Sequence, residues 1–381
     1  MQRLLVCVGV VLLMVPCLSE AATTSRLTGN VVDRDDAALP GVTVTLSSEI
    51  LIGGAQVAIT GADGDFSFNL LPPGNYTIRT DLPGFIAGEV EARVALDRAT
   101  QVRIMMVMEE FAAEIEVTAE APVVDTAQVT SGESYNESFL QNAAVGMGGR
   151  DYLSVIGNEA GSVGSGNVRV LGGLQSDNVF LIDGLNTTDP ITGTFGTNFN
   201  YDAIAEVSIQ TSGFEAEFGQ ALGGVINLVT KSGGNQFSGA FDARYRDQSF
   251  YQSTDLYDPD ENIGSLREIS GTLGGPIARD KVWFFVSARD SLSERTPTGA
   301  PVTREFDGLD WIGKVTWQAA EAHRLIIKAS GDPATITHAN SSRTITPEAS
   351  RTQEQGGDIY QAELNSVLSD AWLLSLQAGA N

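Results

Sequence analysis

The sequence predicts a mainly β protein: an N-terminal β-sandwich, then a mixed α/β domain, then the first strands of an antiparallel transmembrane β-barrel. Three observations predict this fold class. Short strands separated by turn residues fill 26–108. An apolar, glycine-bounded strand, Val225–Thr230, ends a glycine-rich middle region. Longer segments from Phe237 to Asn381 alternate apolar and polar residues, as strands do between lipid and an aqueous lumen.

The composition argues against several functions. The chain has 381 residues, a formal net charge of −25 at pH 7 and only two histidines. Such an acidic chain lacks the basic surface that nucleic-acid binding needs, so no nucleic-acid partner is expected. His323 and His338 have no cysteine near them, which argues against a structural zinc site. The sequence implies neither a cofactor nor a metal.

Residues 1–22 have the pattern of a signal peptide. Leu4–Val15 is an apolar run too short for a transmembrane helix, and small residues allow cleavage after Ala21 or Ala22. Both cysteines of the chain lie in this segment, so the mature protein is expected to have no disulfide and no thiol chemistry. A lipoprotein anchor at Cys17 is the less favoured alternative.

Residues 23–108 are predicted to form a small β-sandwich, because turn signals separate its short strands at near-regular spacing. The strands and turns contain the series GNVVD, LPGVTV, DGDFSF, LPPGNY and GF. This series resembles the carboxypeptidase regulatory-like domain, which is an accessory sandwich and not a peptidase. Asp33, Asp63 and Asp65 could supply oxygen ligands for calcium. Aspartate is also a favoured turn residue, and we prefer that interpretation.

Residues 109–125 are predicted to be a linker that contains a short extended segment. Extended segments of this kind can add a strand to the edge of another protein's sheet through main-chain hydrogen bonds. A structural strand or a plain linker is the alternative. The segment consists of Glu114, Ile115, Glu116, Val117, Thr118 and Ala119.

Residues 126–234 are predicted to form the mixed domain, in which Ser134–Ala144 is expected to be a short helix capped by Ser134. The domain ends in the stretch EAEFGQALGGVINLVTKSGG, and the strand VFLIDG precedes it. This order of motifs resembles the plug domain of TonB-dependent outer-membrane receptors. Leu171 and Gln220 depart from the family pattern, which often has arginine at both places. The matching residues are Asp183, Gly184, Glu217, Phe218, Gly219, Gly223, Gly224, Asn227, Thr230 and Lys231.

Residues 235–381 are predicted to be the N-terminal portion of a β-barrel. About seven strands alternate, and long polar loops alternate with tight turns, as in outer-membrane barrels. An open set of strands cannot stand in lipid with an unpaired edge, so we expect this chain to be part of a longer protein. Trp283–Phe285 and Trp372 fit an aromatic girdle, although a buried strand explains the first group equally well.

The resemblance implies an outer-membrane receptor of a Gram-negative bacterium that binds a ligand outside and imports it through a plugged barrel. The extended segment at 114–119 would be the TonB box, so TonB with its inner-membrane energising complex and outer-membrane lipid are the implied partners. The ligand stays open among siderophore, cobalamin, oligosaccharide and peptide.

Two other functions are alternatives. The first is an outer-membrane adhesin or scaffold without active transport, in which the sandwich binds a partner and the barrel anchors it. The second is an enzyme. The mature chain has no G-x-S-x-G or H-E-x-x-H motif and no cysteine nucleophile, so no enzymatic activity is expected.

Overall fold

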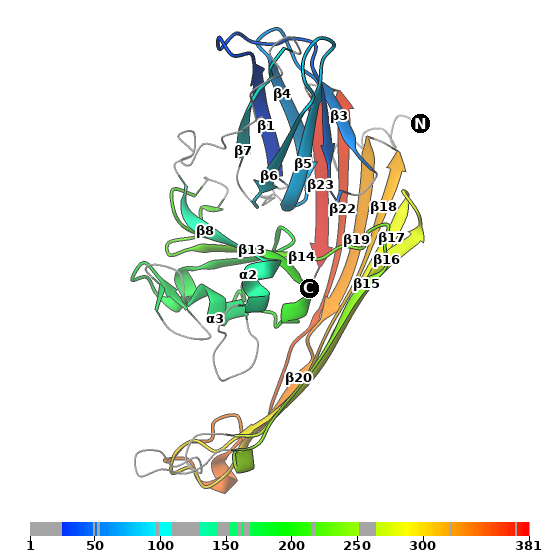
Figure 1. Ribbon diagram of the computed structural model, residues 1–381. Coiled ribbons are helices and arrows are strands. Elements are labelled where there is room, and N and C mark those ends of the chain that lie inside the picture. Colours follow the sequence, from blue (N-terminus) through cyan, green and yellow to red (C-terminus); the bar gives the residue numbers. More distant parts are fainter. Residues whose placement is uncertain are drawn as a thin grey trace, which may run out of the picture.

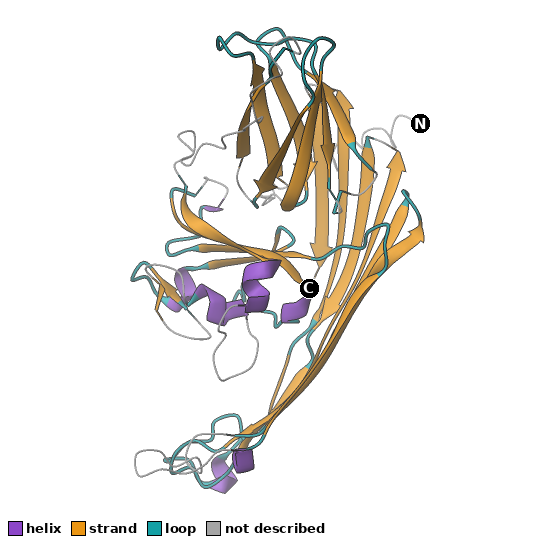
Figure 2. Ribbon diagram, viewed as in Figure 1, coloured by secondary structure: helices purple, strands orange, loops and turns teal. Residues whose placement is uncertain are grey.

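The computed structural model describes residues 25–48, 50–51, 54–96, 99–108, 130–142, 152–157, 162–163, 168–214, 218–250, 264–320, 322–369 and 372–380. Strands dominate these residues and form a sandwich, a mixed domain and one long curved sheet (Figures 1 and 2). The predicted fold class is confirmed. The predicted signal peptide and the segment at 114–119 lie outside the described residues. No helix among the described residues is long and apolar enough to cross a membrane.

The N-terminal sandwich, residues 25–108, consists of two sheets. Strand β1 lies between β4, to which it is antiparallel, and β7, to which it is parallel; the second sheet has the order β3-β2-β5-β6. Alternate residues such as Leu27, Val44 and Ile78 are fully buried between the sheets, which is the burial expected of a sandwich core. The strands are β1 Ser25–Val32, β2 Thr43–Ser47, β3 Gln56–Ile59, β4 Asp65–Leu71, β5 Gly74–Asp81, β6 Gly88–Val94 and β7 Ala99–Met105.

Asp33 forms a turn within this sandwich. Its Oδ1 accepts hydrogen bonds from the backbone N of Asp35 at 2.8 Å and of Ala37 at 2.9 Å. Among the described residues, no group of three or more histidine, cysteine, aspartate or glutamate side chains could hold a metal ion.

The plug, residues 130–236, is built on a five-stranded sheet with the order β12-β11-β14-β13-β8. Strands β11 and β14 are parallel, and every residue of β14 is buried, as predicted for the glycine-bounded strand. Helices α2 and α3 cover one side of the sheet (Figure 2). The elements are β8 Ser131–Asn136, α2 Glu137–Asn142, α3 Tyr152–Ile156, β9 Ser162–Val163, β10 Arg169–Val170, β11 Val179–Ile182, β12 Leu185–Asn186, β13 Ile204–Ser212 and β14 Val225–Thr230.

The predicted start of the first plug helix is wrong. Ser134 lies in strand β8, where it pairs with Ser208 of β13, and the helix begins three residues later at Glu137. Asn136 is the residue that caps it, because Asn136 Oδ1 accepts a hydrogen bond from the backbone N of Phe139 at 2.9 Å. Sheet pairing with β13, a contact distant in sequence, outweighs the local capping signal.

The barrel sheet, residues 237–380, has the order β15-β16-β17-β18-β19-β22-β23, with each strand antiparallel to the next. This path contains the seven strands that the alternation predicts. The short hairpin β20–β21 extends it by pairing with β18. The strands are β15 Ser238–Arg246, β16 Leu266–Ala278, β17 Val282–Arg295, β18 Arg304–Ala320, β19 His323–Gly331, β20 Ala334–Thr337, β21 Gln353–Gln355, β22 Asp358–Ser369 and β23 Trp372–Ala380.

The two ends of the barrel sheet differ. The long connections, such as 332–357, lie at one end, and the tight turns, such as 279–281, lie at the other (Figure 1). The sandwich lies at the end of the tight turns, and the plug lies against the concave face between the two ends (Figure 1). In outer-membrane barrels the short turns are periplasmic. The sandwich and the tight turns lie at the same end of the barrel sheet.

In the barrel sheet many polar side chains are buried and many apolar side chains are exposed, the opposite of the distribution in a water-soluble protein. Polar side chains that face the plug, such as Glu268, Lys328 and Gln361, are at most 6% exposed. Apolar side chains between them, such as Ile327 and Phe241, are more than half exposed on the convex face. This pattern is that of a wall between lipid and a polar interior.

One aromatic group does not fit the predicted girdle. Trp283 is fully buried, and its Nε1 donates a hydrogen bond to Asn235 Oδ1 at 2.8 Å. The alternative of a buried strand is therefore correct for Trp283, because its ring points toward the segment that leads from the plug into β15. Trp372, at 72% exposed, does lie on the surface.

Candidate contact site between plug and barrel

The Asp183–Gly184 pair forms the tip of a tight hairpin between β11 and β12. Ile182 pairs with Leu185, and both residues between them have positive φ, 48° for Asp183 and 77° for Gly184. Two positive φ values define a type I′ turn, for which Asp-Gly is a favoured sequence. The sequence VFLIDG therefore dictates a hairpin whose tip carries a carboxylate.

The Asp183 carboxylate is buried and fully engaged. Within the plug, it accepts hydrogen bonds from the backbone N of Thr230 at 2.8 Å and from Thr230 Oγ1 at 2.7 Å. From the barrel, Lys328 Nζ lies 2.8 Å from Oδ2 and Lys314 Nζ lies 3.5 Å from Oδ1. One plug side chain thus joins β14 to the barrel strands β18 and β19.

The two lysines face each other across neighbouring strands. Lys314 and Lys328 are paired in the register of β18 and β19, and their side chains are 5% and 2% exposed. Like charges directly opposite each other on a sheet destabilise it. Asp183 supplies one counter-charge from the plug, and the Glu363 carboxylate on β22 of the barrel supplies another near Lys314.

Two glutamines extend the same contact to the next strands. Gln361 Nε2 on β22 and Gln377 Nε2 on β23 each donate a hydrogen bond to the backbone carbonyl of Asp183 at 2.7 Å. The tip of the hairpin is therefore bound by side chains from four adjacent barrel strands. We call this set, Asp183, Thr230, Lys314, Lys328, Gln361 and Gln377, the Asp183 cluster.

The charge state of Asp183 follows from these contacts. Burial alone would raise the pKa of the carboxyl, but the ammonium groups of Lys314 and Lys328 and the hydrogen bonds from Lys328 and Thr230 outweigh burial. The pKa of Asp183 is consequently held well below its usual range. The carboxylate stays ionised at any physiological pH.

A second row of contacts lies along plug residues 198–202. Residues at alternate positions reach three different places on the barrel sheet, and the chain turns into the short 3-10 helix Tyr201–Ala203 with Asn200 as its N-cap. Asn198 N donates to Asp332 Oδ2 at 2.7 Å, Asn200 Nδ2 donates to Ser287 Oγ at 2.6 Å, and Ser270 Oγ donates to Asp202 Oδ2 at 2.8 Å.

Asp332 connects the plug to a long loop. It follows β19 directly, and its Oδ1 accepts a hydrogen bond from Gly357 N at 3.1 Å while Oδ2 binds Asn198. Burial raises the pKa of Asp332 to about 6, although the backbone hydrogen bonds from Asn198 and Gly357 act in the opposite direction. This carboxyl is therefore a group that titrates just below neutral pH.

The structure brings some of the predicted motif residues together and separates others. Asp183, Gly184 and Thr230 meet in the Asp183 cluster. Lys231 points away from it and forms an ion pair with Glu137 of α2 at 2.7 Å. Glu217 and the segment 114–119 lie outside the described residues.

The remaining motif residues pack inside the plug. Phe218 is buried against Ala221 and Val225, and Gly219 follows it in a turn. A Cβ on Gly223 would lie 2.6 Å from Asn178 Oδ1, so this position needs glycine for close approach. Gly224 is held by a 3.0 Å hydrogen bond from its N to Asn178 Oδ1, and Asn227 is fully buried in β14.

The plug motif alone did not identify the barrel half of the site. Lys314, Lys328 and Gln361 occupy the polar, lumen-facing positions of the predicted strand alternation, so a signal for their orientation was present. Nothing in the sequence indicates which lumen-facing residues contact the hairpin tip, because that depends on how the plug is rotated inside the barrel.

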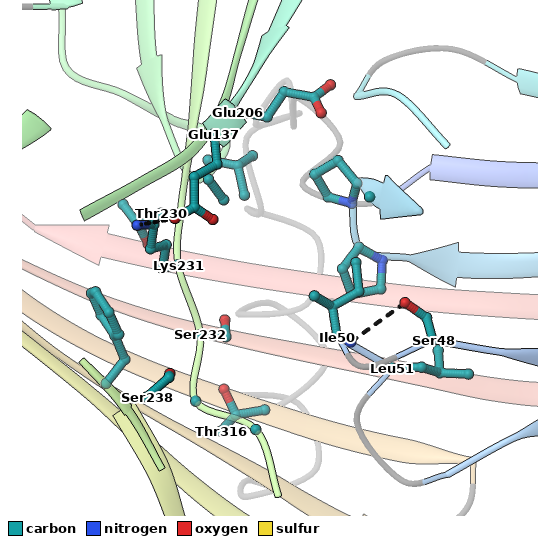
Figure 3. Close-up of a pocket in the computed structure, with 18 of the residues that line it drawn as sticks. Ser48, Ile50, Leu51, Glu137, Glu206, Thr230, Lys231, Ser232, Ser238 and Thr316 are labelled. Carbon is teal, nitrogen blue, oxygen red and sulfur yellow. Dashed lines mark hydrogen bonds and ion pairs between the residues drawn. The ribbon is translucent and has the colours of Figure 1, made fainter. Parts of the chain in front are cut away.

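A cavity of about 1230 Å³ adjoins the Asp183 cluster. Its lining includes Lys314 and Thr316 of the barrel, Thr230 and Lys231 of the plug, and loop residues of the sandwich. Figure 3 shows the sandwich residues Ser48, Ile50 and Leu51 on the side of the cavity opposite Lys231. The cavity thus lies where the three parts of the chain meet.

Comparison with known proteins agrees with this architecture. Residues 26–107 match the carboxypeptidase regulatory-like domain family. The chain is 29% identical over 288 residues to the TonB-dependent transporter Oar of Myxococcus xanthus; the match covers 71% of the chain and 27% of that transporter. The chain therefore spans about a quarter of the length of this curated relative.

Solved structures of siderophore receptors share the fold. A ferric enterobactin receptor mutant (PfeA R480A) from Pseudomonas aeruginosa, in complex with enterobactin, aligns with a TM-score of 0.50 and 15% identity over 67% of this chain and 41% of that one. The siderophore receptor PirA from Acinetobacter baumannii aligns with a TM-score of 0.51 and 16% identity over 65% and 39%. At such identities the likeness establishes the fold alone.

Proposed function

We propose that this homologue of a TonB-dependent transporter belongs to an outer-membrane receptor that binds a ligand at its extracellular face and imports it with energy delivered by TonB. The observation that carries the proposal is the Asp183 cluster. A folded domain is held against the polar, concave face of a sheet whose convex face is apolar. A domain in that position blocks the lumen of a barrel.

The import cycle then requires movement of the plug. The cluster joins the plug to four barrel strands, and residues 198–202 add further contacts. Thermal motion alone opens such a set of contacts rarely, so an external pull is needed. We propose that TonB supplies the pull by pairing with Glu114–Ala119 through main-chain hydrogen bonds. Ligand bound outside must favour exposure of this segment, since a ligand with equal affinity for both states shifts nothing.

A substitution in the proposed TonB segment tests this function. Val117→Pro removes a backbone donor in the middle of the segment, which strand addition cannot tolerate. We expect uptake driven by the proton gradient to be lost, while the amount of protein in the outer membrane stays the same. The measurement is accumulation of radiolabelled candidate ligands, one from each of the four chemical classes, in cells that express the protein from its own gene.

The control is Ala127→Pro, which places the same residue in the chain outside the segment and should leave uptake intact. Uptake at the normal rate in the Val117→Pro cells would refute the role of the segment. Absence of uptake in the unmodified cells, for all ligand classes, would instead favour an adhesin or scaffold anchored by the barrel.

A further inference from the structure

The sandwich and the plug meet at a buried carboxylate. Glu206 lies on β13 and is 1% exposed. Its Oε1 accepts a 2.6 Å hydrogen bond from the backbone N of Leu96, in the sandwich, and a second hydrogen bond from Ser134 Oγ on β8. Arg93 of β6 lies 3.7 Å from its Oε2. One acid therefore receives a main-chain donor and a cation from the sandwich while it also binds the plug.

The same contact closes one side of the cavity. Glu206 and Arg93 both line it, and so does the sandwich loop that contains Ile50 and Leu51. The opposite wall carries Thr316 of the barrel, whose side chain points toward the cavity and is 2% exposed. The sandwich thus covers the periplasmic side of the space between plug and barrel wall.

We propose that the sandwich is a lid, docked on the plug through Glu206, which must move aside before cargo can leave the barrel on the periplasmic side. Docking follows from the contacts themselves. The link to cargo release rests on the proposed transport function.

The position of Ser134 connects the lid to the energy source. Strand β8, which contains Ser134, is the first described strand after the segment 114–119, and β7 of the sandwich is the last described strand before it. A pull on that segment is transmitted to both sides of the Glu206 contact at once. Because β8 is, among the described strands, an edge strand paired with β13, the pull loads its Ser134–Glu206 hydrogen bond directly. Undocking of the lid and loosening of the plug edge are then one event.

Cysteine labelling in isolated outer membranes tests the lid without any ligand. Thr316→Cys places a thiol beneath the sandwich, and Ser67→Cys places one on its exposed surface, each in a protein otherwise free of cysteine. With a water-soluble maleimide we expect the thiol at position 316 to react at least ten times more slowly than the thiol at position 67. Equal labelling rates at positions 316 and 67 would refute the proposal that the sandwich is a lid.

Two variants release the lid from opposite sides of the contact. Glu206→Ala removes the acceptor from the plug, and Arg93→Glu sets a second acid against Glu206 from a half-exposed position on the sandwich. Each should raise the labelling rate at position 316 about tenfold. The matched control is Glu137→Ala, an acid that lines the same cavity but pairs with Lys231 of the plug; it should leave the rate unchanged.

The Arg93→Glu variant distinguishes undocking of the sandwich from unfolding of the plug, because it changes a sandwich residue and removes no buried side chain from the plug. A faster rate in Glu206→Ala alone would show local unfolding of the plug and would refute the lid. Labelling is measured without an energised membrane, so loss of the lid and loss of TonB-driven uptake are separate results. Slow labelling at position 316 together with no uptake of any ligand class in unmodified cells would contradict the proposed function and leave the lid standing.

Discussion

The carboxylate of Asp183 forms ion pairs with two buried lysines of the barrel, Lys314 and Lys328. Removing two lysines and an aspartate from water costs several kcal/mol per ion, and their attraction offsets this only when all partners are present. The register of β18 and β19 sets Lys314 directly opposite Lys328, so loss of Asp183 leaves two buried like charges. We therefore expect this part of the barrel wall to be less stable when the hairpin tip that carries Asp183 is removed.

Replacing Asp183 tests whether the contact between the plug and the barrel wall depends on its charge. Asp183→Asn keeps an acceptor for Thr230 but removes the charge, and breaking a buried ion pair on one side typically costs about 3–5 kcal/mol. We expect the plug to detach at a lower urea concentration, measured in detergent by the fluorescence of Trp283, whose indole donates a hydrogen bond to Asn235 of the plug. Glu133→Gln, which changes an exposed carboxylate on β8 of the plug, should have no measurable effect.

Lys314→Met in the Asp183→Asn background removes one of the two like charges and should restore part of the lost stability. An Asp183→Asn protein as stable as the unmodified one would mean that the buried lysines find another counter-charge.

The raised pKa of Asp332 predicts that the stability of the folded protein depends on pH. Its pKa is raised from an ordinary value near 3.8 to about 6, so the folded state binds more protons than the unfolded state between these values. Stability contributed by this group is therefore present below pH 4, is lost as the pH rises toward 6, and is constant above about 6.5. Asp332→Asn should remove that slope from urea midpoints measured between pH 4 and 7. The same slope in both proteins would assign it to other groups.

The barrel strands alternate between apolar residues on the convex face and polar residues on the concave face that contacts the plug. On β19, Ile327 is 53% exposed on the convex face, while its neighbour Lys328 is 2% exposed on the concave face. A shift of one residue in register would exchange these faces. The lipid and the plug together therefore specify the register more strongly than either would alone.

A charge on the convex face should prevent insertion. Ile327→Arg places a cation toward the hydrocarbon, at a cost of about 2–4 kcal/mol near the middle of the bilayer. We expect less protein in the outer membrane and a loss of the heat-modifiable form on electrophoresis. Ile59→Arg, on an exposed position of the sandwich, should leave both unchanged. Normal assembly of the Ile327→Arg protein would contradict the assignment of this face to lipid.

At the scale of the whole molecule, the sandwich has its own hydrophobic core. The residues of that core come only from the sandwich, whereas the core of the plug also includes Phe285 and Ile312 of the barrel sheet. The sandwich is therefore joined to the plug by contacts between the two domain surfaces, such as the hydrogen bond from Leu96 N to Glu206. A separate core and a polar interface are the properties of a domain that can move as a unit.

The sandwich should consequently fold alone. Residues 23–108 expressed without the plug and the barrel are expected to show a β-type far-ultraviolet circular dichroism spectrum and one cooperative transition in urea. The plug expressed alone is the comparison, and it should lack a sharp transition because part of its core belongs to the barrel. A sandwich without a cooperative transition would show that it depends on its neighbours, and movement as a rigid lid would then fail.

The sequence predicts correctly the elements that have local causes. The glycine-bounded run Val225–Thr230 requires a buried strand, and the alternation after Phe237 requires strands with two unlike faces. The Asp-Gly turn at 183–184, which ends the predicted strand VFLIDG, was seen only in the structure, although its cause is equally local. Turn chemistry and periodicity act over a few residues, so the order of the chain is enough to predict them. The start of α2 was predicted wrongly because strand pairing between β8 and β13 overrode a local cap.

Which residues contact one another depends on packing between segments that are far apart in the sequence. Asp183 and Gln377 are 194 positions apart, and Leu96 and Glu206 are 110 apart. Their contacts depend on how the plug sits in the barrel and how the sandwich sits on the plug. Those placements result from many weak contacts summed over whole surfaces. The polar face of β18 and β19 was predictable from period-two alternation. The aspartate that pairs with its lysines was visible only once the domains were packed together.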